Sequence, residues 1–218
     1  MKDWIGNSIS GHISNGISQN KNNKRAEHDF YATDPSSVDL FLKRIKKDNL
    51  VLPKTINEPA CGQGHISEEL KKHGYNVISS DLYDHGYGKS GIDFLKSNEK
   101  ADCFITNPPY RFALEFVKKS VENLNPGGIS IMYLKIQFLE GKARNLFFKK
   151  YPPKYVYVNS SRQICAKNGD FKNFNSRLLC YAWYVWYKDF HDEPIIRFIN
   201  LIIKKVGTPF IDMGSCHV

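Results

Sequence analysis

The sequence lacks the long apolar segment that a membrane-spanning helix requires. No uninterrupted run of about eighteen apolar residues occurs, and the mean hydropathy is -0.45. Residues 1–23 are rich in Ser, Asn and Gly and contain no continuous apolar block, so no secretory signal is expected. These absences exclude a membrane-embedded protein and favour a cytoplasmic one.

Cysteine is sparse and its spacing does not suit cross-linking. No two cysteines form a Cys-x-x-Cys pair, and the seven histidines show no metal-ligand spacing. We therefore expect a reducing compartment, no disulfide framework and no metal site. The cysteines are Cys61, Cys103, Cys165, Cys180 and Cys216.

The size and charge of the chain indicate one domain with a preference for anionic partners. Its 218 residues, 41% of them hydrophobic, can bury one sizeable core. Lys and Arg total 31 against 22 Asp and Glu, which gives a net charge of +9. Such an excess favours nucleic acid, although a generally lysine-rich proteome produces the same balance.

The pattern along the chain alternates helices and strands. Residues 1–27 read as a flexible arm, and residues 28–218 as a single domain. The last two strands, rich in aromatic residues expected to pack in the core, are joined without a helix and should pair antiparallel. The chain therefore predicts a doubly wound, mostly parallel α/β sheet with an antiparallel edge and helices on its faces. Periodicity predicts helices over 35–47, 66–73, 112–124 and 140–150, and strands over 55–57, 75–79, 102–106, 129–134, 155–159 and 178–188.

The first candidate functional loop is Glu58-Pro-Ala-Cys-Gly62-Gln-Gly64, which follows a predicted strand and precedes a predicted helix. Open α/β sheets bind ligands at this end of their strands, where glycines allow the backbone to approach and a helix N-terminus offers free amides. Asp81 ends the next strand, nineteen positions after Gly62. A carboxylate at that spacing suits the two hydroxyls of a ribose, so the pattern predicts a nucleoside cofactor. Read alone, the glycine pair is equally consistent with a structural turn.

The second loop is Asn107-Pro108-Pro109-Tyr110. Pro108 has no amide hydrogen, so the chain must leave the sheet there, stiff and extended. The Asn107 amide oxygen and a nearby carbonyl offer two acceptors to one planar amino group, and Tyr110 can stack on the ring that carries it. Acceptors aimed at both hydrogens favour the developing tetrahedral nitrogen of a methyl transfer.

Together, the two loops resemble the motif pair of S-adenosylmethionine-dependent amino-methyltransferases, above all the DNA adenine-N6 methyltransferases of small phage type. Further matches extend from about residue 28 onward and include His28–Pro35, Gly91–Leu95, Ser161-Arg162 and Tyr181–Lys188. The resemblance implies a Rossmann-like fold with a seven-stranded sheet and an antiparallel edge hairpin. It also implies S-adenosyl-L-methionine as cofactor and DNA as substrate, with the target base flipped out.

The resemblance assigns residues to both substrates. Asn107 and the carbonyl of Pro108 would accept hydrogen bonds from the target amine, while Tyr110 stacks on the base. On the cofactor, Asp81 would hold the ribose and Asp93 the adenine amine. The full cofactor-binding set implied by the resemblance is Tyr31 and Thr33, which would close over the methionine moiety, together with Glu58, Ala60, Gly62, Gly64, Asp81 and Asp93.

The chain departs from larger members of that family. About twenty residues separate the strands that end near Leu134 and begin near Tyr155, which leaves no room for a separate target-recognition domain. Sequence specificity would then be short, come from residues 163–176, or depend on a partner subunit. Methyltransferases of RNA or of protein glutamine amides share the second loop, and a non-catalytic cofactor- or nucleic-acid-binding subunit is a third interpretation.

Overall fold

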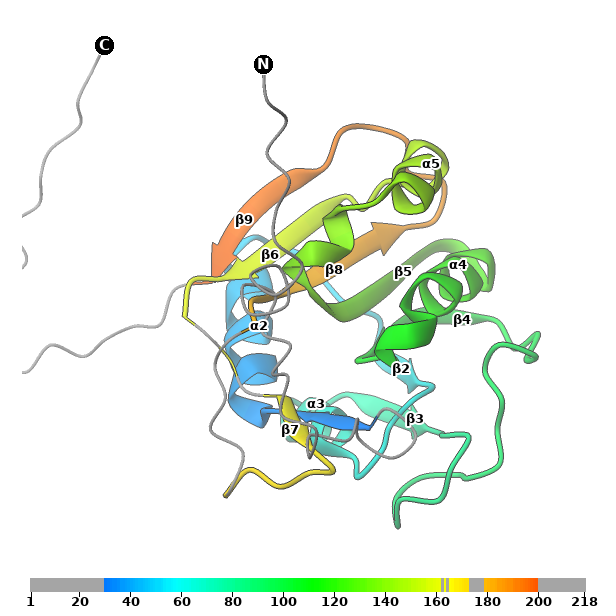
Figure 1. Ribbon diagram of the computed structural model, residues 1–218, viewed down its shortest axis with the longest axis vertical. Helices are drawn as coiled ribbons and strands as arrows, with labels where there is room; N and C mark the ends of the chain where they lie inside the picture. Colours follow the sequence, from blue (N-terminus) through cyan, green and yellow to red (C-terminus); the bar gives the residue numbers. More distant parts are fainter. Residues whose placement is uncertain (1–29, 162, 164, 173–178, 200–218) are drawn as a thin grey trace, which may run out of the picture.

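The computed structural model describes residues 30–161, 163, 165–172 and 179–199, in which strands form two sheets (Figure 1). The larger sheet has seven strands in the order β3-β2-β4-β5-β8-β6-β9, and β8 runs opposite to the other six. The predicted mostly parallel sheet is therefore confirmed. The smaller sheet pairs β1 with β7. The strands are β1 Tyr31–Thr33, β2 Thr55–Glu58, β3 Asn76–Ser79, β4 Ala101–Thr106, β5 Leu124–Lys135, β6 Tyr155–Asn159, β7 Cys165–Lys167, β8 Tyr181–Tyr187 and β9 Ile195–Ile199.

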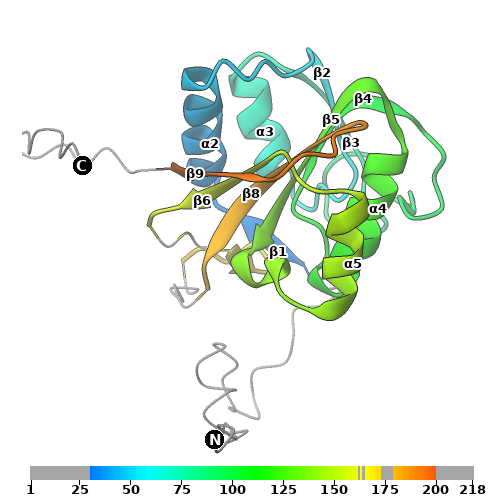
Figure 2. The same cartoon turned by 90° about the horizontal axis from the view of Figure 1, so that it is seen from above.

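Helices cover both faces of the large sheet (Figure 2). Helices α2 and α3 lie on one face, and α4 and α5 lie on the other. Two short 3-10 helices precede α4 and α5. Their bounds are α2 Pro35–Lys47, α3 His65–Lys72, η2 Tyr110–Phe112, α4 Ala113–Glu122, η3 Ile136–Leu139 and α5 Lys142–Lys150. The segment between β5 and β6 thus contains only η3, α5 and short turns.

The start of α2 follows from its sequence. Asp34 caps the helix by accepting a 2.8 Å hydrogen bond from the Ser36 backbone N–H, and Pro35 occupies the first turn, where a missing amide hydrogen costs nothing. Apolar residues at helical spacing then face the sheet, as predicted. The buried apolar residues of α2 are Val38, Phe41, Leu42 and Ile45.

Strand β8 is buried on both faces because it lies in the middle of the layered core. Its side chains alternate between the two helical layers, as the two-residue period of a strand requires. The predicted core role of its aromatic residues is confirmed, since Trp183, Tyr184 and Trp186 are at most 1% exposed. Tyr181, Trp183 and Val185 pack on the α2 and α3 side, whereas Ala182, Tyr184 and Trp186 pack on the α4 side.

Residues 125–128, which lie between the predicted helix over 112–124 and the predicted strand over 129–134, form a bulge inside β5. Leu124 pairs with Ala101, and pairing resumes at Ile129 opposite Cys103. The extra residues fit because Gly127 has a φ of +74°, a conformation that residues with side chains rarely adopt. A β-carbon on Gly128 would lie 2.9 Å from the Asn125 carbonyl oxygen.

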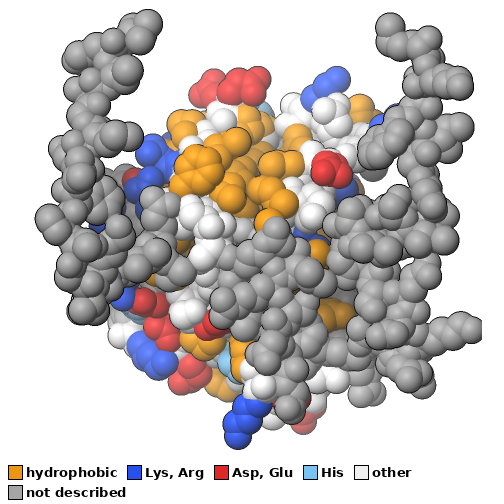
Figure 3. Space-filling view, turned by 60° about the vertical axis from the view of Figure 1, so that its left-hand side comes forward, with side chains coloured by type: hydrophobic (Ala, Val, Ile, Leu, Met, Phe, Trp, Pro, Cys, Tyr) orange, Lys and Arg blue, Asp and Glu red, His pale blue; other side chains and the backbone are white. Residues whose placement is uncertain are grey.

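Three described strands were not predicted. Strands β1 and β7 have three residues each, and β9 extends the large sheet beyond β6. Strand β9 exposes apolar side chains at its edge, with Ile196 and Phe198 each 58% exposed. In the space-filling view, hydrophobic side chains gather in one area of the face turned forward (Figure 3).

Three expectations fall wholly or partly outside the described residues. The flexible arm predicted over 1–27 lies outside them, as do Arg162 and, within the predicted specificity segment 163–176, residues 164 and 173–176. Among the helices that the structure does describe, none has the length and apolar character needed to cross a membrane.

Candidate active site

A cavity of ≈ 250 Å³ lies where β2, β3 and β4 end, at the carboxyl ends of parallel strands. It brings together residues from five separate stretches of the chain, beginning with the β1 strand and ending at the start of α4. Most of the residues predicted for the site from the sequence line it. These are Tyr31, Thr33, Glu58, Ala60, Asp81, Asp93, Asn107, Pro108 and Tyr110.

The two predicted glycines lie next to the cavity and are covered by aromatic rings. Gly62 has a φ of +50°, and a β-carbon there would lie 2.3 Å from Phe30. Gly64 has a φ of +82°, and a β-carbon there would lie 2.6 Å from the ring of Tyr87. Both positions therefore require glycine for backbone conformation and for space.

Asp81 ties the glycine loop to the end of β3. Its Oδ2 accepts a 2.8 Å hydrogen bond from the Gly62 N–H, and its Oδ1 accepts a 3.0 Å bond from the Tyr83 N–H. The residue is 9% exposed. An ionised carboxylate has about four acceptor positions, so two remain for hydroxyl groups of a ligand.

Glu58 lies deeper, at 1% exposure, and receives a hydrogen bond from the Ser67 hydroxyl on α3. The Ser67 and Ser79 hydroxyl oxygens are 2.6 Å apart, which links α3, β2 and β3 through one polar chain. Burial is the main cause that raises the pKa of Glu58 to about 8; the Ser67 hydrogen bonds act against it, and the nearby charge of Asp81 adds to it. Glu58 is therefore mostly protonated at neutral pH in the ligand-free fold.

Replacing Glu58 by Gln should make stability less dependent on pH. The folded pKa near 8 exceeds the ordinary value of 4.5, so the protonated Glu58 contributes its full amount to the stability of the wild type below pH 4.5. This contribution to stability is lost as the pH rises from 4.5 through 8. Relative to wild type, Glu58→Gln should gain about 3–4 kcal/mol of unfolding free energy between pH 5 and pH 8. Urea unfolding of both proteins at several pH values measures this, and a constant difference would contradict the burial argument.

Asp93 caps a turn that lines the cavity. Its Oδ1 accepts a 3.1 Å hydrogen bond from the Leu95 N–H, and its Oδ2 lies 3.1 Å from the Lys96 ammonium. The turn brings Phe94 into a buried cluster with Phe104 and Phe116. This arrangement fixes the direction of the Asp93 carboxylate at the cavity wall.

The Asn107 amide is anchored by the β1 strand. Its Nδ2 donates a 2.9 Å hydrogen bond to the Tyr31 carbonyl oxygen and a 3.0 Å hydrogen bond to the Thr33 Oγ1. Its Oδ1 is buried and receives no hydrogen bond from any described residue. An acceptor left in this state costs about 1–3 kcal/mol, so an unpaired one at a cavity wall indicates a position kept for a ligand donor.

Tyr110 is held by a cluster of aromatic and cationic groups. Its hydroxyl donates to the Tyr181 hydroxyl at 3.2 Å, and its ring lies 5.3 Å from the ring of Tyr31. The Lys135 ammonium lies 4.5 Å from the centre of the Tyr110 ring. Burial, followed by the neighbouring Cys165, raises the pKa of Tyr110 well above its ordinary value. The hydroxyl therefore remains protonated at neutral pH.

The sequence interpretation missed several cavity residues that share a large apolar side chain. Leu82 and Ile92 are direct neighbours of the predicted Asp81 and Asp93, so adjacency could have identified them. Phe116 lies on the buried face of α4, where helical spacing from Ala113 predicts it. Phe30 is likewise the direct neighbour of the predicted Tyr31, but its place over Gly62 depends on a contact between distant segments. The apolar lining residues that received no site role from the sequence include Phe30, Leu82, Ile92, Phe94 and Phe116.

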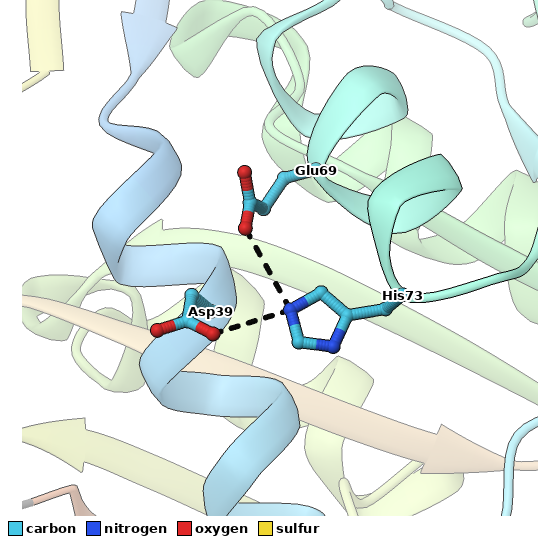
Figure 4. A group of neighbouring side chains, drawn as sticks. All are labelled: Asp39, Glu69 and His73. Atoms are coloured by element: carbon cyan, nitrogen blue, oxygen red, sulfur yellow. Dashed lines mark hydrogen bonds and ion pairs between the residues drawn. The ribbon is translucent and has the colours of Figure 1, made fainter.

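A second polar group lies apart from the cavity lining, between α2 and α3. Asp39, Glu69 and His73 meet there, with the His73 Nε2 3.1 Å from Asp39 and 3.6 Å from Glu69 (Figure 4). The carboxylates also pair with Lys43 and Lys72, respectively. The sequence predicted no metal site, but these three side chains place ligand atoms within 4.8 Å of one another, and the His73 ring links the two helices through its contacts to both carboxylates.

Comparisons with known proteins identify relatives by structure and not by sequence. No protein-family model matches the chain, and no curated protein matches it. Among solved structures, a modification subunit of a provisionally assigned type I restriction enzyme from Vibrio vulnificus YJ016 is 11% identical with a TM-score of 0.56. That match covers 90% of this chain and 52% of the other.

Two further structures show the same fold. The type I restriction enzyme EcoKI M protein is 15% identical with a TM-score of 0.52, and the match covers 83% of this chain and 47% of the other. A provisionally assigned RNA methyltransferase from Pyrococcus horikoshii is 16% identical with a TM-score of 0.53, covering 84% of this chain and 99% of the other. The chain spans about half the length of the two restriction-enzyme proteins. It therefore shares the Rossmann-like α/β fold of these proteins, with a cavity at the end of the sheet where such folds bind ligands.

Proposed function

We propose that the protein transfers a methyl group from S-adenosyl-L-methionine to the exocyclic N6 amine of adenine in DNA. The observation that carries the proposal is the anchored Asn107 amide, whose Oδ1 is a buried acceptor without a partner at the cavity wall. Two further observations support it, namely the fold shared with type I restriction modification proteins and the net charge of +9.

The residues around the cavity fit this cofactor. Asp81 retains acceptor capacity for the ribose hydroxyls, and Asp93 offers a carboxylate to the adenine amine. Leu82 and Ile92 supply apolar contacts beside them. Glu58 would also line the cofactor, and the segment from Tyr31 to Thr33 would close over its methionine moiety. When bound, S-adenosylmethionine supplies an electrophilic methyl group on a sulfonium.

The protein's own part in the reaction is to bind and orient the target amine. The Asn107 Oδ1 and the Pro108 carbonyl accept from its two hydrogens and favour the tetrahedral nitrogen of the transition state. The Tyr110 ring packs on the base and restricts it to the plane in which the nitrogen lone pair meets the methyl group. In duplex DNA the adenine first leaves the helix, at a cost of roughly a few kcal/mol.

The test is incubation of the purified protein with cofactor labelled in its methyl group and with separate DNA, RNA and glutamine-peptide substrates. Label should appear on adenine N6 in duplex or single-stranded DNA, as identified by mass spectrometry of the nucleosides. Matched oligonucleotides built only from G and C provide the control and should remain unlabelled. Label confined to RNA, to the peptide or to cytosine would overturn the assignment of the substrate.

If no substrate is labelled, the protein either fails to bind the cofactor or requires a partner, and further measurements distinguish these two cases. Calorimetry with the cofactor tests whether the site binds it, and lack of binding by the folded protein leaves only a structural role. Binding without transfer indicates a subunit that requires a partner for target recognition, in keeping with a chain half the length of the EcoKI M protein.

A further inference from the structure

The strand β1 lies where it can control the orientation of the Asn107 side chain. Both hydrogens of the Asn107 amide are used, one by the Tyr31 carbonyl and the other by the Thr33 hydroxyl. A backbone carbonyl is an acceptor only, so it admits the amide nitrogen and rejects the amide oxygen. The hydrogen-bond network therefore decides which end of this nearly symmetric side chain faces away from β1.

Of the two anchors, Thr33 is the one that a side-chain substitution can remove. Thr33 is 2% exposed and pairs with Cys165 of β7, so its backbone is held independently of the Asn107 contact. Directly after it, Asp34 caps α2. The Oγ1 of Thr33 is thus fixed from both sides of the residue, which makes it a rigid acceptor at 3.0 Å from the Asn107 Nδ2.

We propose that Thr33 is a positioning residue for methyl transfer, which acts by holding the Asn107 amide with its oxygen available to the target amine. This inference rests on the proposed function and gives Thr33 a role distinct from contact with the cofactor. Without the hydroxyl, one Asn107 hydrogen loses its acceptor and the side chain gains freedom to rotate about its terminal torsion. The two acceptors for the target amine then no longer converge.

The experiment compares Thr33→Val, which keeps the side-chain shape and removes the acceptor, with Thr33→Ser, which keeps the hydroxyl. Thr33→Val should lower kcat about 5- to 30-fold, which is at the lower end of the cost of leaving one buried amide hydrogen without an acceptor. The Kd for the cofactor should change less than twofold. Thr33→Ser should retain at least about a third of wild-type kcat. Thr55→Val, at the exposed start of β2, is the matched control and should behave as wild type.

Two kinetic outcomes would overturn the inference. Unchanged kcat in Thr33→Val would show that the hydroxyl does not orient Asn107 during transfer. A rise in cofactor Kd that accounts for the whole loss of kcat/KM, with kcat intact, would assign Thr33 to the cofactor only.

A readout that needs no activity keeps this inference separate from the proposed function. The side-chain amide of Asn107 gives two proton resonances in NMR, assigned by their loss in Asn107→Asp. In wild type both protons should be protected from exchange with solvent, and in Thr33→Val one should exchange at least about tenfold faster. Equal protection in both proteins contradicts the positioning role, whether or not the protein methylates DNA. An inactive wild type with the expected exchange difference contradicts only the proposed function.

Discussion

Replacing Asn107 by Ala should lower the rate of methyl transfer about 100- to 1,000-fold, the usual effect of removing one oriented hydrogen-bonding group that acts in the transition state. The amide is the group whose acceptor is buried, unpartnered among the described residues and anchored through two donors to β1. Cofactor binding should be nearly unaffected, with Kd within about threefold of wild type. Single-turnover kinetics with labelled cofactor measure the rate, and calorimetry measures the Kd.

Asn107→Asp is the informative companion variant. A carboxylate has the same shape as the amide but donates no hydrogen bond, so it faces the Tyr31 carbonyl with an acceptor against an acceptor. We expect a loss of rate at least as large as in Asn107→Ala, although an acceptor oxygen is still present. Wild-type rates in either variant would exclude Asn107 from the reaction.

Replacing Asp81 by Asn should weaken cofactor binding about 10- to 100-fold. The carboxylate accepts from the Gly62 and Tyr83 backbone amides with separate oxygens, whereas an Asn side chain offers only one oxygen and turns a donor toward the other amide. The glycine loop then loses one attachment to β3, and the ribose loses an acceptor. Calorimetric titration with the cofactor gives the change in Kd.

The matched control is Asp84→Asn, a residue three positions further along the same segment. Asp84 is exposed and, among the described residues, accepts a local hydrogen bond from the Gly86 N–H at 2.9 Å. It should bind the cofactor as wild type does. Equal weakening in both variants would attribute the effect to net charge and would remove the specific role of Asp81.

Local patterns were sufficient to predict most of the large sheet. The helix from Pro35 to Lys47 was predicted because its apolar spacing, its cap and its proline agree. The two short strands β1 and β7 could not be predicted, because Thr33 and Cys165 pair across more than a hundred residues and neither segment has periodicity of its own. Strand β9 was missed because it is an edge strand whose outward side chains, such as Phe198, are not buried.

In the candidate site too, local patterns predicted the positions of residues, whereas their contacts depend on the fold. The positions of Asp81 and Asn107 could be predicted from strand ends and turn residues, because the carboxyl ends of parallel strands meet at one edge of the sheet. The partners of these side chains depend on the fold as a whole. The sequence could not predict that Thr33 would bond to Asn107, that Phe30 would cover Gly62, or that Glu58 would be buried deeply enough to raise its pKa.

The place of β8 in the sheet has a consequence for synthesis on the ribosome. Strand β8 lies between β5 and β6 although it follows β6 in the chain, so β6 has no neighbour in the growing sheet until residues 181–187 have emerged. The four strands β3, β2, β4 and β5 come from residues 55–135 and can assemble earlier. A nascent chain whose first 170 residues have emerged would therefore expose the unpaired hydrogen-bonding edges of β5 and β6, and chaperones that shield strand edges would act at that stage.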